Sequence, residues 1–224
     1  MADKICFAAV ILISYLLGSI NASIVISNIK GTDIRKYGSG NAGATNMLRT
    51  YGKTMAVLAL VFDALKGILA VGAAAAFQKA LAQNGIESSL TDGLRYMGAL
   101  FVVIGHNYPV FFGFKGGKGI ATSGAVMFML DWRAGLVVLT GAIVVMVITR
   151  YVSLGSMVGA VLYVAAPLFF NIAVDKKLNY WFIIVSVILA AMAVYRHKKN
   201  IVRLIHGTES KVGKSKKPEK TEKA

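Results

Sequence analysis

The stretch GSGNAGATNMLR (38–49) gathers small polar side chains, glycines and one arginine. If a helix begins near Asn41, then Asn41, Thr45 and Arg49 share one face. Ser39 would then cap this helix, beside backbone amides that attract anions. The Arg49 guanidinium can donate two parallel hydrogen bonds to a phosphate. We therefore expect a phosphate site here. The alternative is a glycine-rich connector with a surface arginine.

The stretch GHNYPVFFGFKGGKGIATSG (105–124) holds a second pattern of this kind. Its KGGKG core offers two lysines and a compact turn of backbone amides. A helix beginning at about Ile120 would place Thr122 and Ser123 in its first turn. The neighbouring apolar PVFFGF segment suits an apolar group attached to the phosphate. The alternative is a tight turn at a membrane surface, with lysines that extend toward water.

A third polar pattern is divided between YVSLGS (151–156) and RHKKNIVRLIHGTE (196–209). On a helix, Asn200, Arg203 and either His206 or Gly207 line up at spacings of three to four residues. The same pattern is typical of an amphipathic helix at a membrane surface. By itself it leaves both interpretations open.

Two charged residues, Asp63 and Lys66, interrupt an otherwise apolar run. Charges within a bilayer are costly, so we expect the two side chains to pair and to face the interior of a helix bundle. Both a structural ion pair and a catalytic role are compatible with this spacing, because an isolated buried pair is poor evidence of chemistry.

Three well-known motifs are excluded by their context. GSGNAG matches G-x-G-x-x-G, but the preceding apolar segment is too long for the strand of a dinucleotide-binding fold. KGGKG is not a nucleotide-binding P-loop, because Phe112 stands where its first glycine belongs and Gly119 follows the lysine. His106 lacks the acidic partner of a His-x4-Asp pair, since Phe111 occupies that position.

The composition of the chain around these motifs is that of a membrane protein. Of 224 residues, 56% are hydrophobic and 16% are charged, and the mean hydropathy is +0.64. Apolar runs long enough to span a bilayer are typical of helices, which pair every backbone amide internally. The sequence therefore predicts an all-α polytopic integral membrane protein of about seven transmembrane helices. The alternative is five helices and a re-entrant hairpin. The long runs are 5–28, 54–77, 95–112, 133–149, 152–174 and 178–195, with a weaker one at 120–130.

The basic residues set the expected orientation. Most of the 25 Lys and Arg residues lie in 29–53, 115–118 and 196–224. The positive-inside rule then places the N-terminus outside and the C-terminus in the cytoplasm, so that all three polar stretches meet the cytoplasmic face. The net charge of +15 is mainly topological, with some attraction to anionic lipid headgroups.

We expect one membrane-embedded domain over 1–210 and a basic, disordered cytoplasmic tail over 211–224. The tail has no aromatic residues among its lysines, so we expect no nucleic-acid partner. Cys6 is the single cysteine, which excludes an intramolecular disulfide. The three histidines lack the spacing of zinc ligands, and we expect neither a metal nor a cofactor.

Together the polar runs resemble the cytoplasmic motifs of the PlsY-type acyl-phosphate:glycerol-3-phosphate acyltransferases. The runs are GTDIRKYGSGNAGATNMLRTYG, GHNYPVFFGFKGGKGIAT and RHKKNIVRLIHGTE, of which the first two are long and specific and the third is weaker. The likeness extends over nearly the whole chain and includes YLLGS (15–19) and DALKG (63–67). One departure is Asn21, where the family usually has proline after GSI; it affects a helix start.

This resemblance implies transfer of a fatty acyl group from acyl phosphate to the sn-1 hydroxyl of glycerol 3-phosphate at the cell membrane. The products would be lysophosphatidic acid and inorganic phosphate, with no use of acyl-CoA or acyl carrier protein. The implied partners are glycerol 3-phosphate, long-chain acyl phosphate and membrane lipid. The enzyme that produces acyl phosphate is a further candidate partner, and the oligomeric state is left open.

The resemblance also implies site residues. Those for glycerol 3-phosphate are Ser39, Asn41, Thr45, Asn46, Arg49, Ser153, Ser156 and Asn200. Those for the acyl-phosphate head are Gly116, Gly117, Lys118, Gly119 and Thr122, and Glu209 would close the site.

Acyl phosphate is already activated, so no nucleophilic side chain is expected. Orientation alone can contribute about 7–11 kcal/mol, and charge stabilisation adds to it. We expect a phosphate oxygen to accept the hydroxyl proton; the alternative bases are His106, His206 and Glu209. The rival class is a secondary transporter for an anionic metabolite, which also uses broken helices. The sequence has no internal repeat, and this favours the enzyme.

Overall fold

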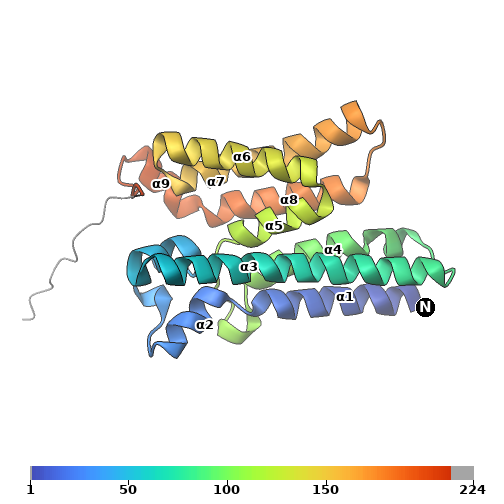
Figure 1. Cartoon of the computed structure of the whole chain (residues 1–224), viewed down its shortest axis with the longest axis horizontal. Helices are drawn as coiled ribbons and strands as arrows, with labels where there is room; N and C mark the ends of the chain where they lie inside the picture. The colour runs from blue at the N-terminus through green and yellow to red at the C-terminus, as the bar shows by residue number, and fades with distance from the viewer. Residues whose placement is uncertain (1, 213–224) are drawn as a thin grey trace, which may run out of the picture.

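In the computed structural model, residues 2–212 are described, and all regular structure in this range is helical. The tail expected beyond residue 210 falls largely outside the described residues. Figure 1 shows the helices in chain order. The α-helices are α1 (Ala2–Ser19), α2 (Ala22–Ile29), α3 (Ala44–Gln83), α4 (Ser89–Asn107), α5 (Ile120–Leu130), α6 (Trp132–Thr149), α7 (Val152–Phe169), α8 (Tyr180–Arg196) and α9 (Lys198–Ile205). Shorter elements are the 3-10 turns η1 (Ile34–Lys36) and η2 (Val110–Phe112) and a π-helical end of α7, η3 (Phe170–Val174).

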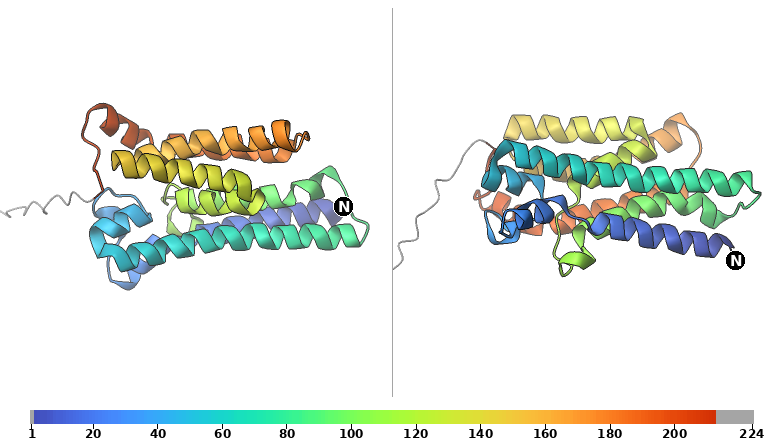
Figure 2. Two further views of the ribbon diagram at one scale, coloured as in Figure 1. Left: turned by 45° about the horizontal axis from the view of Figure 1, so that its top comes forward. Right: turned by 60° about the horizontal axis from the view of Figure 1, so that its bottom comes forward.

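The long helices run side by side in two groups (Figures 1 and 2). One group contains α1, α3 and α4, which contact one another, and the other contains α6, α7 and α8. The short helix α5 lies between the groups and contacts α3 on one side and α6 on the other. This arrangement places the start of α5, and the glycine-rich loop before it, at the junction of the two groups.

Helix α4 is buried by protein rather than by lipid. It packs against α1, α3 and α8, and most of its residues are buried, among them Leu94, Ala99 and Val102 at 0% exposure. A helix surrounded by other helices does not need the apolar exterior of a lipid-facing one. This explains why α4 can carry polar residues such as Thr91 and His106 in its buried part.

The predicted count of seven spans is not confirmed. Three helices are long and apolar enough to cross a membrane: α3, α6 and α7 with its π-helical end. The number rises to five if the bent pairs α1–α2, at 41°, and α8–α9, at 55°, each form one span. The run at 95–112 begins in α4, which is not among these spans, and continues past its end at Asn107 into η2, whereas α5 is only 11 residues long. The expected short helix at 120–130 is present with those bounds.

The first and third polar stretches lie at the same end of the bundle. Figure 1 shows α2, the beginning of α3 and α9 together at one end, with the N-terminus and the α3–α4 connection at the other. A backbone hydrogen bond from Val212 to the carbonyl of Arg150 joins the segment after α9 to the turn before α7. Segments distant in sequence thus share one end of the molecule.

The start of the first motif differs from the expectation. Helix α3 begins at Ala44, with Gly43 as an N-cap that makes no side-chain capping bond. Ser39 is therefore not the cap, and Asn41 precedes the helix instead of sharing a face with Thr45. Gly40 is in a left-handed conformation, at φ 70°, which a helix capped by Ser39 would not allow at its first residue.

Candidate active site

Residues from the second and third polar stretches meet where Lys118 contacts Asn200. The Lys118 ammonium is hydrogen-bonded to the carboxamide oxygen of Asn200 on α9. Asn200 Nδ2 in turn donates to Glu209 Oε1 at 2.7 Å, and the Ser153 hydroxyl on α7 donates to the same oxygen at 2.9 Å. These hydrogen bonds join four of the predicted site residues into one network.

Glu209 is the acidic centre of this network. Its other oxygen, Oε2, accepts from Arg203 Nε at 2.6 Å, and only 5% of the side chain is exposed. Burial acts to raise its pKa, but hydrogen bonds from Arg203, Asn200 and Ser153 outweigh burial and hold the pKa of Glu209 below its ordinary value. At neutral pH Glu209 is therefore an anion that orients donors, and it is a weak base.

Lys118 stands in an unusually cationic setting. Burial and the positive charges of Arg203, Arg196 and Arg49 lower the pKa of Lys118 to about 8, although Glu209 acts in the opposite direction. A lysine whose charge is opposed by neighbouring cations gains from binding an anion.

The KGGKG loop is held from both sides. The amides of Gly116 and Gly117 donate to the carbonyls of Asn107 and His106, each at 3.2 Å. Arg196 donates to the carbonyls of Gly116 and Gly117, at 2.9 and 2.7 Å. The expected turn of anion-binding amides is therefore wrong for Gly116 and Gly117, because the fold uses those two amides itself. The first amides of α5, beyond Gly119, have no partner within the helix, as at any helix N-terminus.

Gly119 and Gly117 meet distinct structural needs. Gly119 caps α5 in the left-handed region, at φ 75°. A methyl group added to Gly117 would lie 2.2 Å from His106 Nε2 and 2.4 Å from the Ala42 carbonyl oxygen. The second polar stretch therefore approaches the first one closely, and Gly117 permits the contact.

Asn46 organises the first polar stretch from within. Its Nδ2 donates to the carbonyls of Ile34 and Tyr37, at 3.1 and 2.9 Å, and its Oδ1 accepts from the Ser39 amide at 2.9 Å. Asn46 is only 1% exposed. The structure thus gives Asn46 a supporting place below the loop that presents Ser39.

The remaining members of the first stretch are open to solvent or partly so. Ser39 and Arg49 are exposed, whereas Asn41 and Thr45 are half-buried. Arg35 connects this stretch to the second, because its Nη1 donates to the carbonyls of Phe112 and Lys115 at 2.8 and 3.1 Å. Ser39 and Arg49 are therefore the members of the stretch whose side chains a solute can approach most freely.

Two other predicted residues use their hydroxyl groups within the protein. Thr122, at 0% exposure, donates to the Asp63 carbonyl at 2.8 Å. Ser156 donates to the Val152 carbonyl, one turn earlier in α7, at 2.9 Å. Both side chains lie close to the site region, but their hydrogens point into the fold.

The two candidate histidine bases occupy opposite environments. His106 is 3% exposed and lies against Asp63 and Lys66, whereas His206 is exposed at the end of α9, with Nδ1 2.8 Å from the Val202 carbonyl. Within residues 2–212 there is no cluster of three or more His, Cys, Asp or Glu side chains that could hold a metal ion.

Arg196, Arg35 and His197 were not among the predicted site residues. Arg196 and Arg35 act on backbone carbonyls, which no sequence spacing reveals. Arg196 also stacks over the Tyr108 ring, 5.1 Å from its centre. His197 lies at the bend between α8 and α9, is 2% exposed and approaches the Ala193 carbonyl with Nδ1 at 2.7 Å. Its position beside Arg196 in RHKKN was the one available signal.

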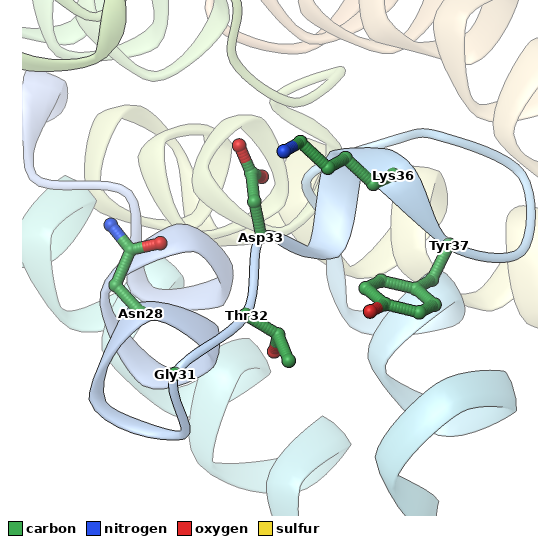
Figure 3. A pocket seen from close by; sticks show the side chains of 6 residues that line it. All are labelled: Asn28, Gly31, Thr32, Asp33, Lys36 and Tyr37. Atoms are coloured by element: carbon green, nitrogen blue, oxygen red, sulfur yellow. The ribbon is translucent and has the colours of Figure 1, made fainter.

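Two hollows lie near these residues. An apolar cleft of about 80 Å³ runs between α5, α6, α7 and α8, from Ile120 past Ser156 to Tyr163. An open polar hollow of about 370 Å³ lies on the loop after α2, where Figure 3 shows Asp33 and Lys36 extending to the same side. The Asp33 carboxylate is already bound by Arg35 at 2.8 Å, so this hollow offers no free acid.

Comparison with known proteins agrees with this geometry. Residues 8–207 match the family model described as glycerol-3-phosphate acyltransferase. A glycerol-3-phosphate acyltransferase of Clostridioides difficile (strain 630) is 42% identical over 211 residues, which are 94% of this chain and 97% of that one. A protein of the same description from Francisella tularensis subsp. holarctica (strain OSU18) is 39% identical over 92% of each chain.

The fold is also found in solved structures. The crystal structure of PlsY, an integral membrane glycerol 3-phosphate acyltransferase, in its glycerol 3-phosphate form has a TM-score of 0.77 and 36% identity, over 92% of this chain and 96% of that one. A second crystal structure of PlsY, in its lysophosphatidic acid form, has a TM-score of 0.74 and 35% identity, over 92% and 95%. Matched along nearly its whole length in both sequence and fold, the chain belongs to the glycerol-3-phosphate acyltransferase family and is an integral membrane acyltransferase.

Proposed function

We propose that the protein transfers an acyl group from long-chain acyl phosphate to the sn-1 hydroxyl of glycerol 3-phosphate, which gives lysophosphatidic acid and inorganic phosphate. One observation carries the proposal: cations gather around the KGGKG loop, because Arg196 binds the carbonyls of Gly116 and Gly117 and Lys118 is bound to Asn200. Asn200 also binds Glu209, the acid that Arg203 contacts. This excess of positive charge favours two phosphorylated substrates at one place.

The glycerol 3-phosphate would bind at the first polar stretch. The exposed Arg49 guanidinium and Ser39 hydroxyl are free to approach a phosphate, and Asn46 fixes the loop between them. The glycerol 3-phosphate and lysophosphatidic acid forms of the related PlsY support a site for this substrate and this product.

The acyl phosphate would bind at the second stretch. Lys118 would pair with its phosphate near the first amides of α5. The apolar cleft between α5 and α7 begins at Ile120, directly after this loop, and would receive the first part of the acyl chain. A site with a charged head and an apolar continuation toward the bilayer suits an anionic lipid better than a water-soluble donor.

The chemistry needs no acyl-enzyme. The glycerol hydroxyl attacks the acyl carbonyl, the carbon–oxygen bond to phosphate breaks, and phosphate leaves with the hydroxyl proton. A phosphate oxygen of the donor is the proton acceptor we propose, because Glu209 is held as a weak base and His106 is buried. Lys118 and Arg196 would stabilise the charge that develops on the leaving phosphate.

We further propose that this site faces the cytoplasm of a bacterial cell and that the N-terminus lies outside. The first and third polar stretches lie at one end of the bundle (Figure 1), and the second contacts both of them. The segments 29–53, 115–118 and 196–224 of the sequence contain most of the chain's basic residues. The positive-inside rule then gives the orientation. A cytoplasmic enzyme that produces acyl phosphate could deliver its product to this face.

The test uses purified protein in detergent with glycerol 3-phosphate and palmitoyl phosphate. We expect phosphate and lysophosphatidic acid in equal amounts and no reaction when palmitoyl-CoA replaces the donor. Arg49→Ala should react much more slowly when glycerol 3-phosphate is kept below the KM of wild type. Turnover with palmitoyl-CoA alone would overturn the donor assignment. No turnover with either donor, together with uptake of labelled glycerol 3-phosphate by proteoliposomes, would favour the transporter.

A further inference from the structure

A buried polar cluster of Asp63, Lys66 and His106 lies beneath the proposed donor site and takes no part in the reaction described above. Lys66 and Asp63 form an ion pair at 2.9 Å, and Lys66 Nζ lies 3.0 Å from His106 Nδ1. All three are buried: Lys66 is 5% exposed, Asp63 2% and His106 3%. A charged cluster this deep is costly to bury, which makes it a candidate for a functional role.

The cluster closes the break between α1 and α2. Lys66 Nζ donates to the carbonyls of Gly18 and Ile20, at 3.0 and 2.9 Å, which are left without helical partners where α1 ends. The next residue, Asn21, caps α2 and donates from Nδ2 to the Ala42 carbonyl at 3.3 Å. Lys66 is thereby connected to the backbone of the first polar stretch.

The hydrogen bonds of Lys66 include the His106 ring. An ammonium group has three protons, and the three hydrogen-bond partners of Lys66 Nζ are the carbonyls of Gly18 and Ile20 and His106 Nδ1. The Asp63 carboxylate pairs with the charge of Lys66, and its Oδ1 lies 3.3 Å from His106 Nδ1. The other ring nitrogen, Nε2, faces Gly117.

His106 supports the KGGKG loop (115–119), named the donor loop from here on, with its ring and with its backbone. Its carbonyl accepts the Gly117 amide at 3.2 Å, and Nε2 is so close that a methyl group on Gly117 would lie 2.2 Å away. The Asp63 carbonyl also accepts the Thr122 hydroxyl in the first turn of α5. The His106 residue and the Asp63 backbone thus contact the chain on the two sides of Lys118, at Gly117 and at Thr122.

We propose that Asp63 and Lys66 are positioning residues, which hold the His106 ring so that it places Gly117, and with it Lys118, against the first polar stretch. The identity of the donor in this inference rests on the proposed function, whereas the placement of the loop does not. Since His106 Nε2 is covered by Gly117, the ring supports the loop and does not exchange a proton with the substrate.

Two variants of similar shape test this. His106→Asn keeps a polar atom at the place of Nδ1, because the amide can present either its oxygen or its nitrogen there, and His106→Leu has the same branching without a polar atom. We expect the Leu variant to raise the KM for palmitoyl phosphate by about tenfold or more and the Asn variant to stay within about threefold of wild type. An equal loss of kcat in both variants at unchanged KM would identify direct proton transfer and overturn the inference.

Hydrogen exchange supplies a measurement that does not depend on turnover. The amides of Gly116 and Gly117 are hydrogen-bonded to α4, so their protection reports where the loop lies. We expect exchange in the loop to become about tenfold faster in His106→Leu and to change little in His106→Asn. Unchanged protection of these amides in both variants would overturn the inference. Inactivity of wild type with palmitoyl phosphate would count against the proposed function alone, because hydrogen exchange does not depend on turnover.

A second variant keeps the test valid if His106→Leu does not fold. Asp63→Asn combined with Lys66→Met removes both charges at once, leaves no unpaired ion and should reproduce the faster loop exchange. The control is Asp175→Asn. Asp175 lies between η3 and α8, and the substitution breaks its 2.7 Å ion pair with Arg133 on α6. We expect the control to leave KM and loop exchange unchanged. If the control changed KM and loop exchange as much as the double variant, the cluster would contribute only to general stability, and its positioning role would be overturned.

Discussion

The ammonium of Lys118, in the loop before α5, is hydrogen-bonded to the carboxamide oxygen of Asn200 on α9. The two residues are 82 positions apart, and the contact joins the two groups of helices at the proposed site. A carboxamide oxygen can hold an ammonium without neutralising it, whereas a carboxylate would compete with a substrate phosphate. Lys118 is thus oriented and still free to pair with an anion.

The charge of Lys118 should limit activity at alkaline pH. Because its pKa is about 8, the free enzyme loses this positive charge as the pH rises through 8, and donor binding weakens. We expect kcat/KM for the acyl donor to fall above about pH 8 in wild type. Lys118→Arg stays protonated, so its profile should remain flat through pH 9. If kcat/KM of the arginine variant also fell above about pH 8, the loss of activity would be due to the titration of another group.

Glu209 should be needed as an anion. Glu209→Gln can keep an oxygen for Ser153 and Asn200 but loses the charge that balances Arg203 and Lys118. We expect kcat/KM to fall by roughly 100-fold through misplacement of these groups. Ser153→Ala removes one donor to the same oxygen and should cost clearly less. An effect of Ser153→Ala as large as that of Glu209→Gln would instead give the serine a direct role.

Gly117→Ala should abolish most activity in folded protein. The added methyl group would meet the Ala42 carbonyl oxygen at 2.4 Å, so the donor loop must move away from the first polar stretch. We expect a loss of about 100-fold in kcat/KM. Gly72→Ala is the control, since its methyl group would meet only Met129, at 3.8 Å, and it should leave activity unchanged. Full activity of Gly117→Ala would refute the close approach.

Much of this fold could be predicted from the apolar runs, but their breaks could not. The short helix at 120–130 was confirmed with its bounds. The run 5–28, by contrast, is interrupted between Ser19 and Ala22, where Lys66 binds the freed carbonyls. Hydropathy reports which segments prefer lipid. It contains no information on a break that a side chain from another helix satisfies.

The same limit applies to the site. Sequence spacing singled out Lys118 and Asn200, the family resemblance added Glu209, and the structure brings the three together. It could not separate exposed from supporting residues, because Asn46 and Arg49 look equally suited to phosphate in the sequence. The difference arises from burial: Asn46 faces the backbone of its own loop, and Arg49 faces outward.

Arg49→Ala should weaken binding of glycerol 3-phosphate specifically. Hydrogen bonds to a charged group contribute about 1.5–3 kcal/mol, so the KM for glycerol 3-phosphate should rise roughly 10- to 100-fold. The KM for palmitoyl phosphate should change little. Lys53→Ala is the matched control: this exposed cation lies just beyond the break of α3 at Gly52 (φ 81°), and its loss should leave both KM values like wild type. A rise in the donor KM alone would move Arg49 to the other substrate.

Thiol labelling should decide the orientation of the chain. In a Cys6→Ala background, single cysteines at exposed positions at the two ends of the bundle report the side of the membrane: Asn84→Cys and Lys176→Cys on one side, Lys30→Cys and Lys199→Cys on the other. The positive-inside rule predicts that a membrane-impermeant maleimide added to intact cells labels the first pair only. The second pair should react after permeabilisation. The reverse pattern would place the basic end, and with it the proposed site, outside the cell. Labelling of Asn84→Cys but not of Lys176→Cys would mean that the two connections lie on opposite sides of the membrane.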